Sequence, residues 1–241
     1  MMTPLAFTQF YEKWFDHLHH LVNQLSDSAS AFIDVKGDYS TNTPPMTAEQ
    51  EEKLVELIGK VMSHHEEYFR AKSLLTENDP LSVVASPWAT TLERSLHWVT
   101  GWRPTTAFHL VYTESSVLFE SHIIDILRGV RTGDLGDLSP TQFRRVSELQ
   151  CDTVKEENQI TDELSDWQDS ASELMDPRAD INEKIERLVC IIKKADDLRL
   201  RTMRSVVGLL SPQQAIEFLI ASAELLVGIR GWGSNHDRPR G

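Results

Sequence analysis

Cysteine is scarce in this chain, with only Cys151 and Cys190 among 241 residues. Two thiols in a chain of this size argue against a disulfide framework and are typical of a reducing compartment. Both lie within helical patterns, where a free cysteine usually behaves as a small buried hydrophobe. We therefore expect two buried thiols in a nuclear or cytoplasmic protein.

Long apolar runs and an excess of positive charge are also lacking. No stretch approaches the roughly 20 apolar residues that span a bilayer, and the first ten residues lack the basic segment that begins a secretory signal. Lys and Arg number 24 against 37 Asp and Glu, which gives a formal net charge of −13. Because phosphate contacts need clustered basic residues, we predict no direct nucleic-acid binding and no membrane attachment.

Strand patterns are nearly absent, since no alternation of β-branched and aromatic residues persists along the chain. Apolar residues recur instead every three or four positions, as in residues 7–25. We predict an all-α fold, a single helical bundle of about seven to eight helices, several of them long. One domain is expected over residues 5–233, with a flexible polar linker at 26–46 and a disordered tail at 234–241.

Helix starts are marked by a hydroxyl residue followed three positions later by glutamine. This capping-box spacing satisfies backbone amides that a helix leaves unpaired, and it begins at Thr47, Ser139 and Ser211. Ser86, followed by proline, resembles the last two of these starts. It predicts a helix through residues 88–100 that ends at Gly101.

Motifs for catalysis and metal binding are missing. The sequence has no HExxH, no Cys-x-x-Cys, no phosphate-binding loop and no nucleophile elbow. Without such motifs, the nine histidines are typical of solvated or core-edge positions. Acidic pairs such as Glu156-Glu157 and Asp196-Asp197, and the basic cluster 199–204, are typical of solvated helix faces. We therefore predict no metal site and no enzyme.

Residues 88–104 concentrate three of the six tryptophans. On the predicted helix, the last two of them are four residues apart and project together. One interpretation is core packing, because aromatic residues at helical spacing usually supply buried area. The other is a partner-binding surface, because aromatic residues and arginine dominate binding hot spots, and the wide apolar face of the first helix is a further candidate. The candidate partner-binding residues are Glu93, Trp98, Trp102, Arg103 and, on the first helix, Trp14.

Three segments carry the signature of a family. They read TLERSLHWVTGWRPTTAFHLVY, GDLGDLSPTQFRRVSELQ and ADDLRLRTMRSVVGLLSPQQAIEFLIASAELLVGIRGWG. In order and spacing they resemble the plant Delay of Germination domain, over about residues 7–237, and the GDLGDLSP loop favours the stand-alone Delay of Germination-like proteins. TGA-type bZIP transcription factors carry the same domain. This sequence shows no basic region or leucine zipper ahead of it, so DNA binding is not carried over.

The resemblance implies a non-enzymatic plant regulator that acts by protein–protein interaction in seed dormancy and maturation or in abscisic-acid signalling. It implies type-2C protein phosphatases or TGA-type bZIP factors as partners, the latter in transcriptional co-regulation. A more distant branch implies a role in pollen aperture placement.

Family members are also associated with haem binding through histidines on the last helix. The positions that resemble those ligands hold Leu226 and Arg230, which cannot coordinate iron as imidazole does. We therefore expect no cofactor. A small-molecule sensor, with haem or a lipid held between the helices, remains the alternative.

Overall fold

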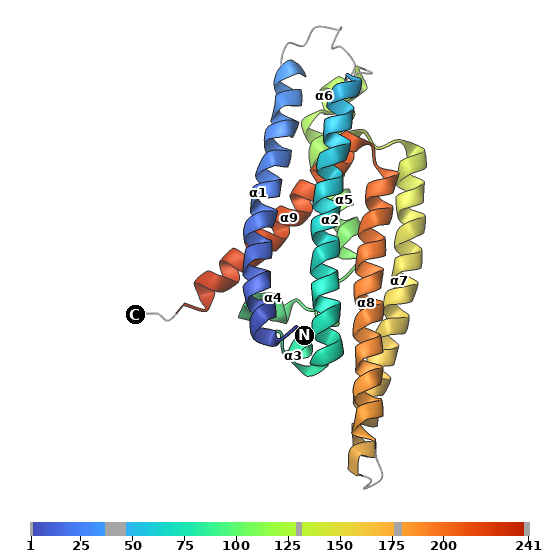
Figure 1. Cartoon of the computed structure of the whole chain (residues 1–241). Helices are drawn as coiled ribbons and strands as arrows, with labels where there is room; N and C mark the ends of the chain where they lie inside the picture. The colour runs from blue at the N-terminus through green and yellow to red at the C-terminus, as the bar shows by residue number, and fades with distance from the viewer. Residues whose placement is uncertain (1, 37–46, 129–131, 176–179, 239–241) are drawn as a thin grey trace.

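The computed structural model of the chain describes residues 2–36, 47–128, 132–175 and 180–238 (Figure 1). Over these ranges the chain forms α-helices and short 3-10 helices joined by turns, and it forms no β-strand. The predicted all-α fold is therefore confirmed. Within the same ranges, no helix combines the length and apolar character that a bilayer crossing requires.

The long helices make up most of the bundle. They are α1 (Pro4–Lys36), α2 (Ala48–Asn78), α7 (Pro140–Asp169), α8 (Ile181–Leu209) and α9 (Pro212–His236). Figure 1 shows α1, α2, α8 and α7 side by side, while α9 passes obliquely behind α1 and α2 and contacts both. The paired helices α7 and α8 extend well past the rest of the bundle at one end.

Short elements connect the long helices. They are α3 (Pro80–Ala85), α4 (Thr91–Ser95), α5 (Thr106–Ser121), α6 (Ile123–Leu127), η1 (Leu135–Asp137) and η2 (Ser170–Met175). Helix α4 packs against α9, and α5 packs against η1 and α9. The segment between α4 and α5 is therefore flanked by two helices that both pack against the last helix.

Three of the predicted helix starts are confirmed. Capping boxes with both reciprocal hydrogen bonds begin α2, α7 and α9, at Thr47, Ser139 and Ser211. The last two boxes meet in space, because Gln142 Nε2 donates to Gln214 Oε1 at 2.7 Å. The same capping-box glutamines therefore cap α7 and α9 and also join the two helix starts to each other.

Two predicted boundaries are wrong, because the polar residues at both places remain helical. Helix α1 continues to Lys36, so residues 26–36 are helical; they contain no Gly or Pro to end the helix, and residues 37–46 lie outside the described residues. Helix α9 likewise continues to His236, inside the predicted tail 234–241. Asp237 then accepts a hydrogen bond from the Thr91 amide at 2.8 Å, and residues 239–241 lie outside the described residues.

The predicted helix through residues 88–100 is also wrong. Ser86 does not begin a helix but follows α3 in the left-handed conformation, with φ of 45°. The short helix α4 begins instead at Thr90, where a capping box to Glu93 forms, and it ends before Trp98. Thr90 and Glu93 have the same spacing as the other capping boxes, so the stronger local signal lies four residues beyond Ser86.

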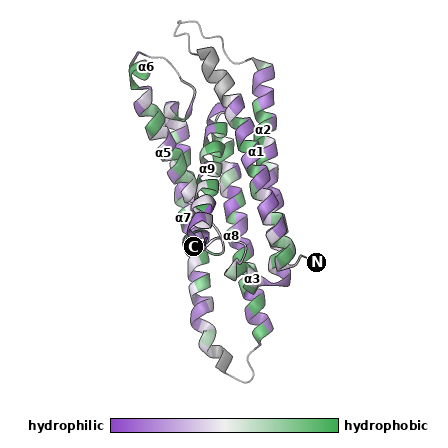
Figure 2. Cartoon of the chain, turned by 90° about the vertical axis from the view of Figure 1, so that its left-hand side faces the viewer, coloured by the Kyte–Doolittle hydropathy of each residue, from purple (hydrophilic) through white to green (hydrophobic). Residues whose placement is uncertain are grey.

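Among the described residues the apolar core has three parts. One lies among α1, α2, α5, η1, α7, α8 and the beginning of α9, and a second, rich in aromatic rings, lies among α1, α2, α3, α8, α9 and residues 88–89. A third joins α7 and α8 to Val99. Figure 2 shows polar and apolar residues mixed along the long helices, as expected for amphipathic helices that share a core. Cys151 and Cys190, which were expected to be buried, are exposed.

Candidate functional site

A tight turn at residues 98–101 follows α4. The Trp98 amide donates to the Gly101 carbonyl at 2.7 Å, and the Gly101 amide donates back at 3.3 Å. The central residues Val99 and Thr100 have φ angles of 43° and 65°. Two successive positive φ angles define a type I′ turn, which favours Gly, Asn and Asp. Two β-branched residues at these positions are strained, so other contacts must hold the turn.

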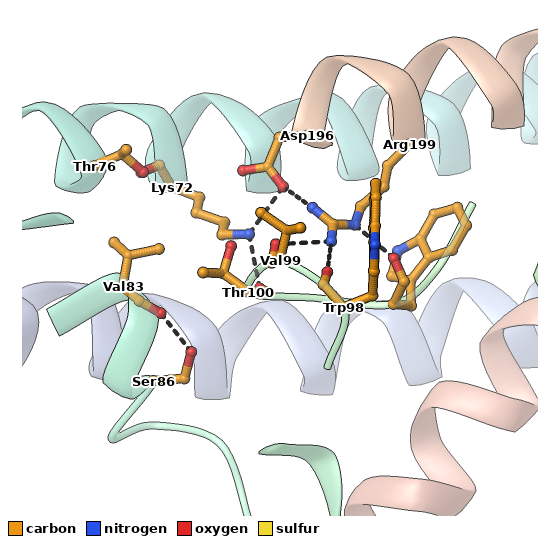
Figure 3. A network of polar contacts seen from close by, with 10 residues as sticks. Lys72, Thr76, Val83, Ser86, Trp98, Val99, Thr100, Asp196 and Arg199 are labelled. Atoms are coloured by element: carbon orange, nitrogen blue, oxygen red, sulfur yellow. Dashed lines mark hydrogen bonds and ion pairs between the residues drawn. The ribbon is translucent and has the colours of Figure 1, made fainter. Parts of the chain in front are cut away.

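Buried cations from α2 and α8 hold this turn through its carbonyl groups (Figure 3). Arg199 donates to three carbonyl oxygens, those of Trp98, Val99 and Trp102. Lys72 Nζ donates to the Thr100 carbonyl at 2.9 Å. Gly101 leaves room for the guanidinium, since a Cβ there would lie 3.1 Å from Arg199 Cζ. Hydrogen bonds from charged donors are strong in a dry interior, so they offset the strain of the backbone.

One carboxylate is shared by the two cations. Asp196 Oδ1 accepts from Lys72 at 2.9 Å and from Arg199 at 2.6 Å, and both basic side chains are 1% exposed. Burial lowers the pKa of Lys72 to about 8, although Asp196 acts in the opposite direction. Two cations against one carboxylate leave a positive charge, which the carbonyl dipoles of the turn face. The ionic cluster and the turn therefore stabilise each other.

A second buried carboxylate joins the same segment to α7. Glu157 accepts from Arg103 Nε at 2.9 Å and from the Thr105 amide at 2.6 Å. Thr105 precedes α5 and makes no side-chain cap of its own, so Glu157 supplies the negative charge that a helix N-terminus favours. Trp98 Nε1 donates to Thr161 Oγ1 at 2.9 Å, one turn further along α7. Trp98 and Arg103 thus lie along the seam between this segment and α7.

A third buried carboxylate, Glu93, ties α4 to α1 and α9. It accepts from the Thr90 amide at 2.7 Å and from the Tyr11 hydroxyl at 2.8 Å. Arg230 lies 3.4 Å from the same carboxylate, and its guanidinium stacks over the rings of Tyr11 and Phe15 at 4.8 and 4.7 Å. Burial, together with the nearby Tyr68 and Glu93, raises the pKa of Tyr11 well above its usual value. The hydroxyl therefore stays protonated and donates to Glu93.

A cavity of about 90 Å³ lies between α1, α2, α9 and the segment that carries the turn. Much of its wall is aromatic, with contributions from Trp14, Phe15, Tyr68, Phe69 and Trp102. His65 and His97 line it as well. Burial lowers the pKa of His65 to about 3 and that of His97 to about 4, so both imidazoles are neutral near pH 7.

The structure separates the predicted partner-binding residues. Trp14 and Glu93 are buried, so the apolar face of α1 belongs to the core and Glu93 is not at an exposed rim. Trp98 and Trp102 do not project together, because Trp98 packs against the α7–α8 cluster and Trp102 lines the cavity. Both tryptophans are partly buried, whereas 49% of the Arg103 side chain is exposed. Of the five residues, Trp98 and Arg103 lie together on one seam.

The positions that the resemblance links to haem do not suit that group. Leu226 lines the cavity with an apolar side chain, and Arg230 is engaged by Glu93. The cavity of about 90 Å³ is also far smaller than the roughly 300 Å³ at which pockets for drug-sized ligands begin. In the ranges that the structure describes, no three His, Cys, Asp or Glu side chains gather closely enough to hold a metal ion. These residues therefore do not fit a haem.

Sequence reasoning missed the buried ionic residues. Glu157, Asp196 and Arg199 were expected on solvated faces, yet all three are buried, while the side chains of the neighbouring Glu156 and Asp197 are 42% and 65% exposed. Helical spacing was the available signal. Asp196 lies four residues after the buried Ile192, and Arg199 lies four residues before the buried Met203, which places both on the core face of α8.

Comparison with known proteins supports the motif-based resemblance. The DOG1 family model, described as seed dormancy control, matches residues 39–113, which include the turn. Protein DOG1-like 3 of Arabidopsis thaliana is 24% identical over 238 residues, covering 90% of this chain and 83% of the relative. Protein DOG1-like 4 of the same plant is 27% identical over 245 residues, covering 95% of this chain and 92% of the relative.

A transcription factor shares the same region. The bZIP transcription factor TGA10 of Nicotiana tabacum is 24% identical over 238 residues, and the match covers 98% of this chain but 42% of the relative. The predicted resemblance is confirmed: residues 39–113 match the DOG1 family model, and most of the chain is similar to plant DOG1-like proteins and to a TGA bZIP transcription factor.

Proposed function

We propose that this chain is a non-enzymatic plant regulatory protein that acts by binding other proteins, in seed dormancy and maturation or in abscisic-acid-linked development. The observation that carries the proposal is the match to the seed dormancy control model, which spans residues 39–113 and so includes the turn. The names of the matched relatives, DOG1-like proteins and bZIP transcription factors, denote no enzyme.

The surface proposed for partner contact is the turn surface, formed by Leu96, Trp98 and Arg103. Leu96 is 54% exposed, and Trp98 and Arg103 lie on the seam with α7. Glu157 orients the Arg103 guanidinium through Nε, and the two terminal nitrogens make no hydrogen bond to the described part of the chain. They are free to bind a carboxylate or phosphate of a partner in bidentate geometry.

The turn surface is also rigid, which favours binding. Lys72 and Arg199 fix the turn through its carbonyl groups, and Glu157 fixes Arg103. A surface that is already ordered loses less conformational entropy when a partner binds. An aromatic side chain beside an oriented arginine is the composition typical of a binding hot spot.

The proposed partners are type-2C protein phosphatases or TGA-type bZIP factors, in the nucleus, the cytoplasm or both. A net charge of −13 disfavours direct contact with nucleic acid, so an effect on transcription is proposed to pass through a TGA-type partner. The chain alone is therefore expected to leave a DNA fragment unshifted in an electrophoretic assay, and a shift without any partner would contradict this part of the proposal.

The test compares how tightly the wild-type chain and the Arg103→Ala variant bind a protein partner. Immobilised protein is exposed to purified type-2C phosphatase or TGA factor, and bound partner is measured by interferometry. Loss of a hot-spot arginine is expected to weaken binding by about tenfold or more. Arg144→Ala is the matched control, because Arg144 also lies on the surface, with 71% of its side chain exposed.

Circular dichroism and the measured affinities together distinguish the possible results. Circular dichroism must give equal helicity for the three proteins, so that loss of binding reports the surface and not the fold. Equal affinity of wild type and Arg103→Ala for every partner that binds refutes the turn surface. Failure of both partner classes to bind the wild-type chain refutes the proposed partners.

A further inference from the structure

The cavity beside the turn has polar groups that the protein itself does not use. His65 is 4% exposed and contacts the ring of Trp14, but its imidazole makes no hydrogen bond to the described residues. The imidazole of His97 and the hydroxyl of Tyr68 also line the cavity without a hydrogen bond to that part of the chain. The polar atoms of these three side chains are not among the fully buried unpaired atoms of the described residues, so they are open to the cavity and available to a partner that enters it.

The charge of these groups restricts what that partner can be. Burial keeps the imidazoles of His65 and His97 neutral, so each offers one donor and one acceptor. The carboxylate of Glu93 is already satisfied by Thr90, Tyr11 and Arg230. A bound ion would therefore find no free counter-charge among the described residues of the wall, whereas an uncharged ligand needs none.

The shape of the cavity restricts the ligand further. Aromatic rings of Trp14, Phe15, Tyr68, Phe69 and Trp102 form flat walls, against which a planar ligand stacks or packs edge to face. A dry cavity of about 150 Å³ holds benzene, so about 90 Å³ accommodates part of one ring. Leu96 lines the cavity and is 54% exposed, so the remainder of the ring lies at an open mouth.

We propose that this cavity binds a small, planar, uncharged molecule with polar atoms on its edge, of the phenol or azole class. Its ring lies among the aromatic side chains, and its polar edge exchanges a hydrogen bond with His65, while His97 and Tyr68 line the same wall. The site adjoins the turn surface proposed for protein partners and shares Leu96 with it. Because Trp102 and Gly101 also belong to the cavity wall, the ligand contacts the same segment from its inner side.

The test uses 4-fluorophenol as the probe and fluorine NMR of the probe as the measurement, with the purified full chain and no protein partner. The wild-type chain is expected to bind it with a dissociation constant of about 1 mM or tighter, as suits a ligand of one ring. Leu226→Trp places a large side chain into the cavity and is expected to abolish binding. Leu225→Trp is the matched control, because Leu225 precedes Leu226 on α9, is exposed, and does not line the cavity.

A second variant tests the polar contact without filling the cavity. His65→Phe keeps a flat ring next to Trp14 but removes both imidazole nitrogens, and it is expected to weaken binding about tenfold. It also keeps the proposal testable if Leu226→Trp fails to fold. Equal binding by wild type and Leu226→Trp, no broadening of the probe signal by the wild type, or unchanged affinity in a folded His65→Phe chain would each overturn the proposal. None of these results bears on the protein–protein function, which is measured with other molecules.

Discussion

Replacing Thr100 by glycine is expected to stabilise the protein, although the change removes a buried side chain. Thr100 has φ of 65°, a conformation that glycine adopts freely and that a β-branched residue adopts under strain. Its hydroxyl oxygen is buried without a hydrogen-bond partner in the described structure. The carbonyl that binds Lys72 belongs to the backbone, so glycine keeps this contact.

The magnitude follows from two stabilising contributions set against two smaller destabilising ones. Relief of the left-handed conformation contributes about 1–2 kcal/mol, and removal of an unpaired buried hydroxyl contributes about 1–3 kcal/mol. The greater freedom of glycine in the unfolded chain costs about 0.5–1 kcal/mol, and the lost methyl contact costs about 1 kcal/mol. The net expectation is a gain of about 2 kcal/mol, which raises the melting temperature of a chain of this length by about 4–8 °C.

Thr100→Ala is the control that isolates the backbone contribution. Alanine also removes the hydroxyl, but its Cβ keeps the strain of positive φ, so it is expected to be about 1 kcal/mol less stable than glycine at this position. Urea denaturation followed by circular dichroism gives both free energies of unfolding on one scale. Glycine less stable than alanine would refute the argument, because it would mean that the turn at Thr100 is not strained.

Three further changes test other parts of the structure. Asp196→Asn leaves Lys72 and Arg199 buried without a carboxylate and is expected to cost about 3–5 kcal/mol in urea denaturation, more than Lys72→Met, which keeps the remaining ion pair. Burial lowers the pKa of His65 to about 3 in the folded chain, so between pH 6.5 and 3 the unfolded chain binds a proton that the folded chain does not. The free energy of unfolding is therefore expected to fall as pH falls, by about 2 kcal/mol at pH 5. The His65→Phe variant should not show this loss of stability. Gly233→Ala brings a Cβ within 2.6 Å of the Thr90 Cβ, where α9 crosses α4. The free energy of unfolding is expected to fall by about 1–3 kcal/mol, and hydrogen exchange of the Thr91 amide is expected to become faster. Unchanged exchange would contradict the contact between these helices.

The helices could be predicted because their signals are local. Thr47, Ser139 and Ser211 satisfy the first amides of their own helices with side chains three residues away, and apolar periodicity identifies the buried faces without knowledge of any neighbour. The same reasoning failed at Ser86, where Pro87 suggested a helix start. The capping box at Thr90 competes with it and places the start later.

The candidate site could not be predicted in the same way, because its residues come from distant parts of the chain. A positive φ at Val99 and Thr100 is locally unfavourable and exists only because Lys72 and Arg199 bind the turn. Nothing near Glu157 in the sequence indicates that its carboxylate binds the amide of Thr105. Adjacent acids with opposite exposure, such as Asp196 and Asp197, can be assigned only from the register of the helix against the core.

The dependence of the turn on α2 and α8 also sets the order in which the protein becomes folded. Lys72 and Arg199 are far apart in the chain, so their contacts with residues 98–101 form only after these helices have packed together. Until then the segment has no reason to adopt its strained form, and it reaches the native conformation late. The Thr100→Gly change should therefore slow unfolding and leave the folding rate almost unchanged. The cavity wall and the turn surface are completed in the same late step, so a newly synthesised chain gains both proposed binding surfaces only when its fold is finished.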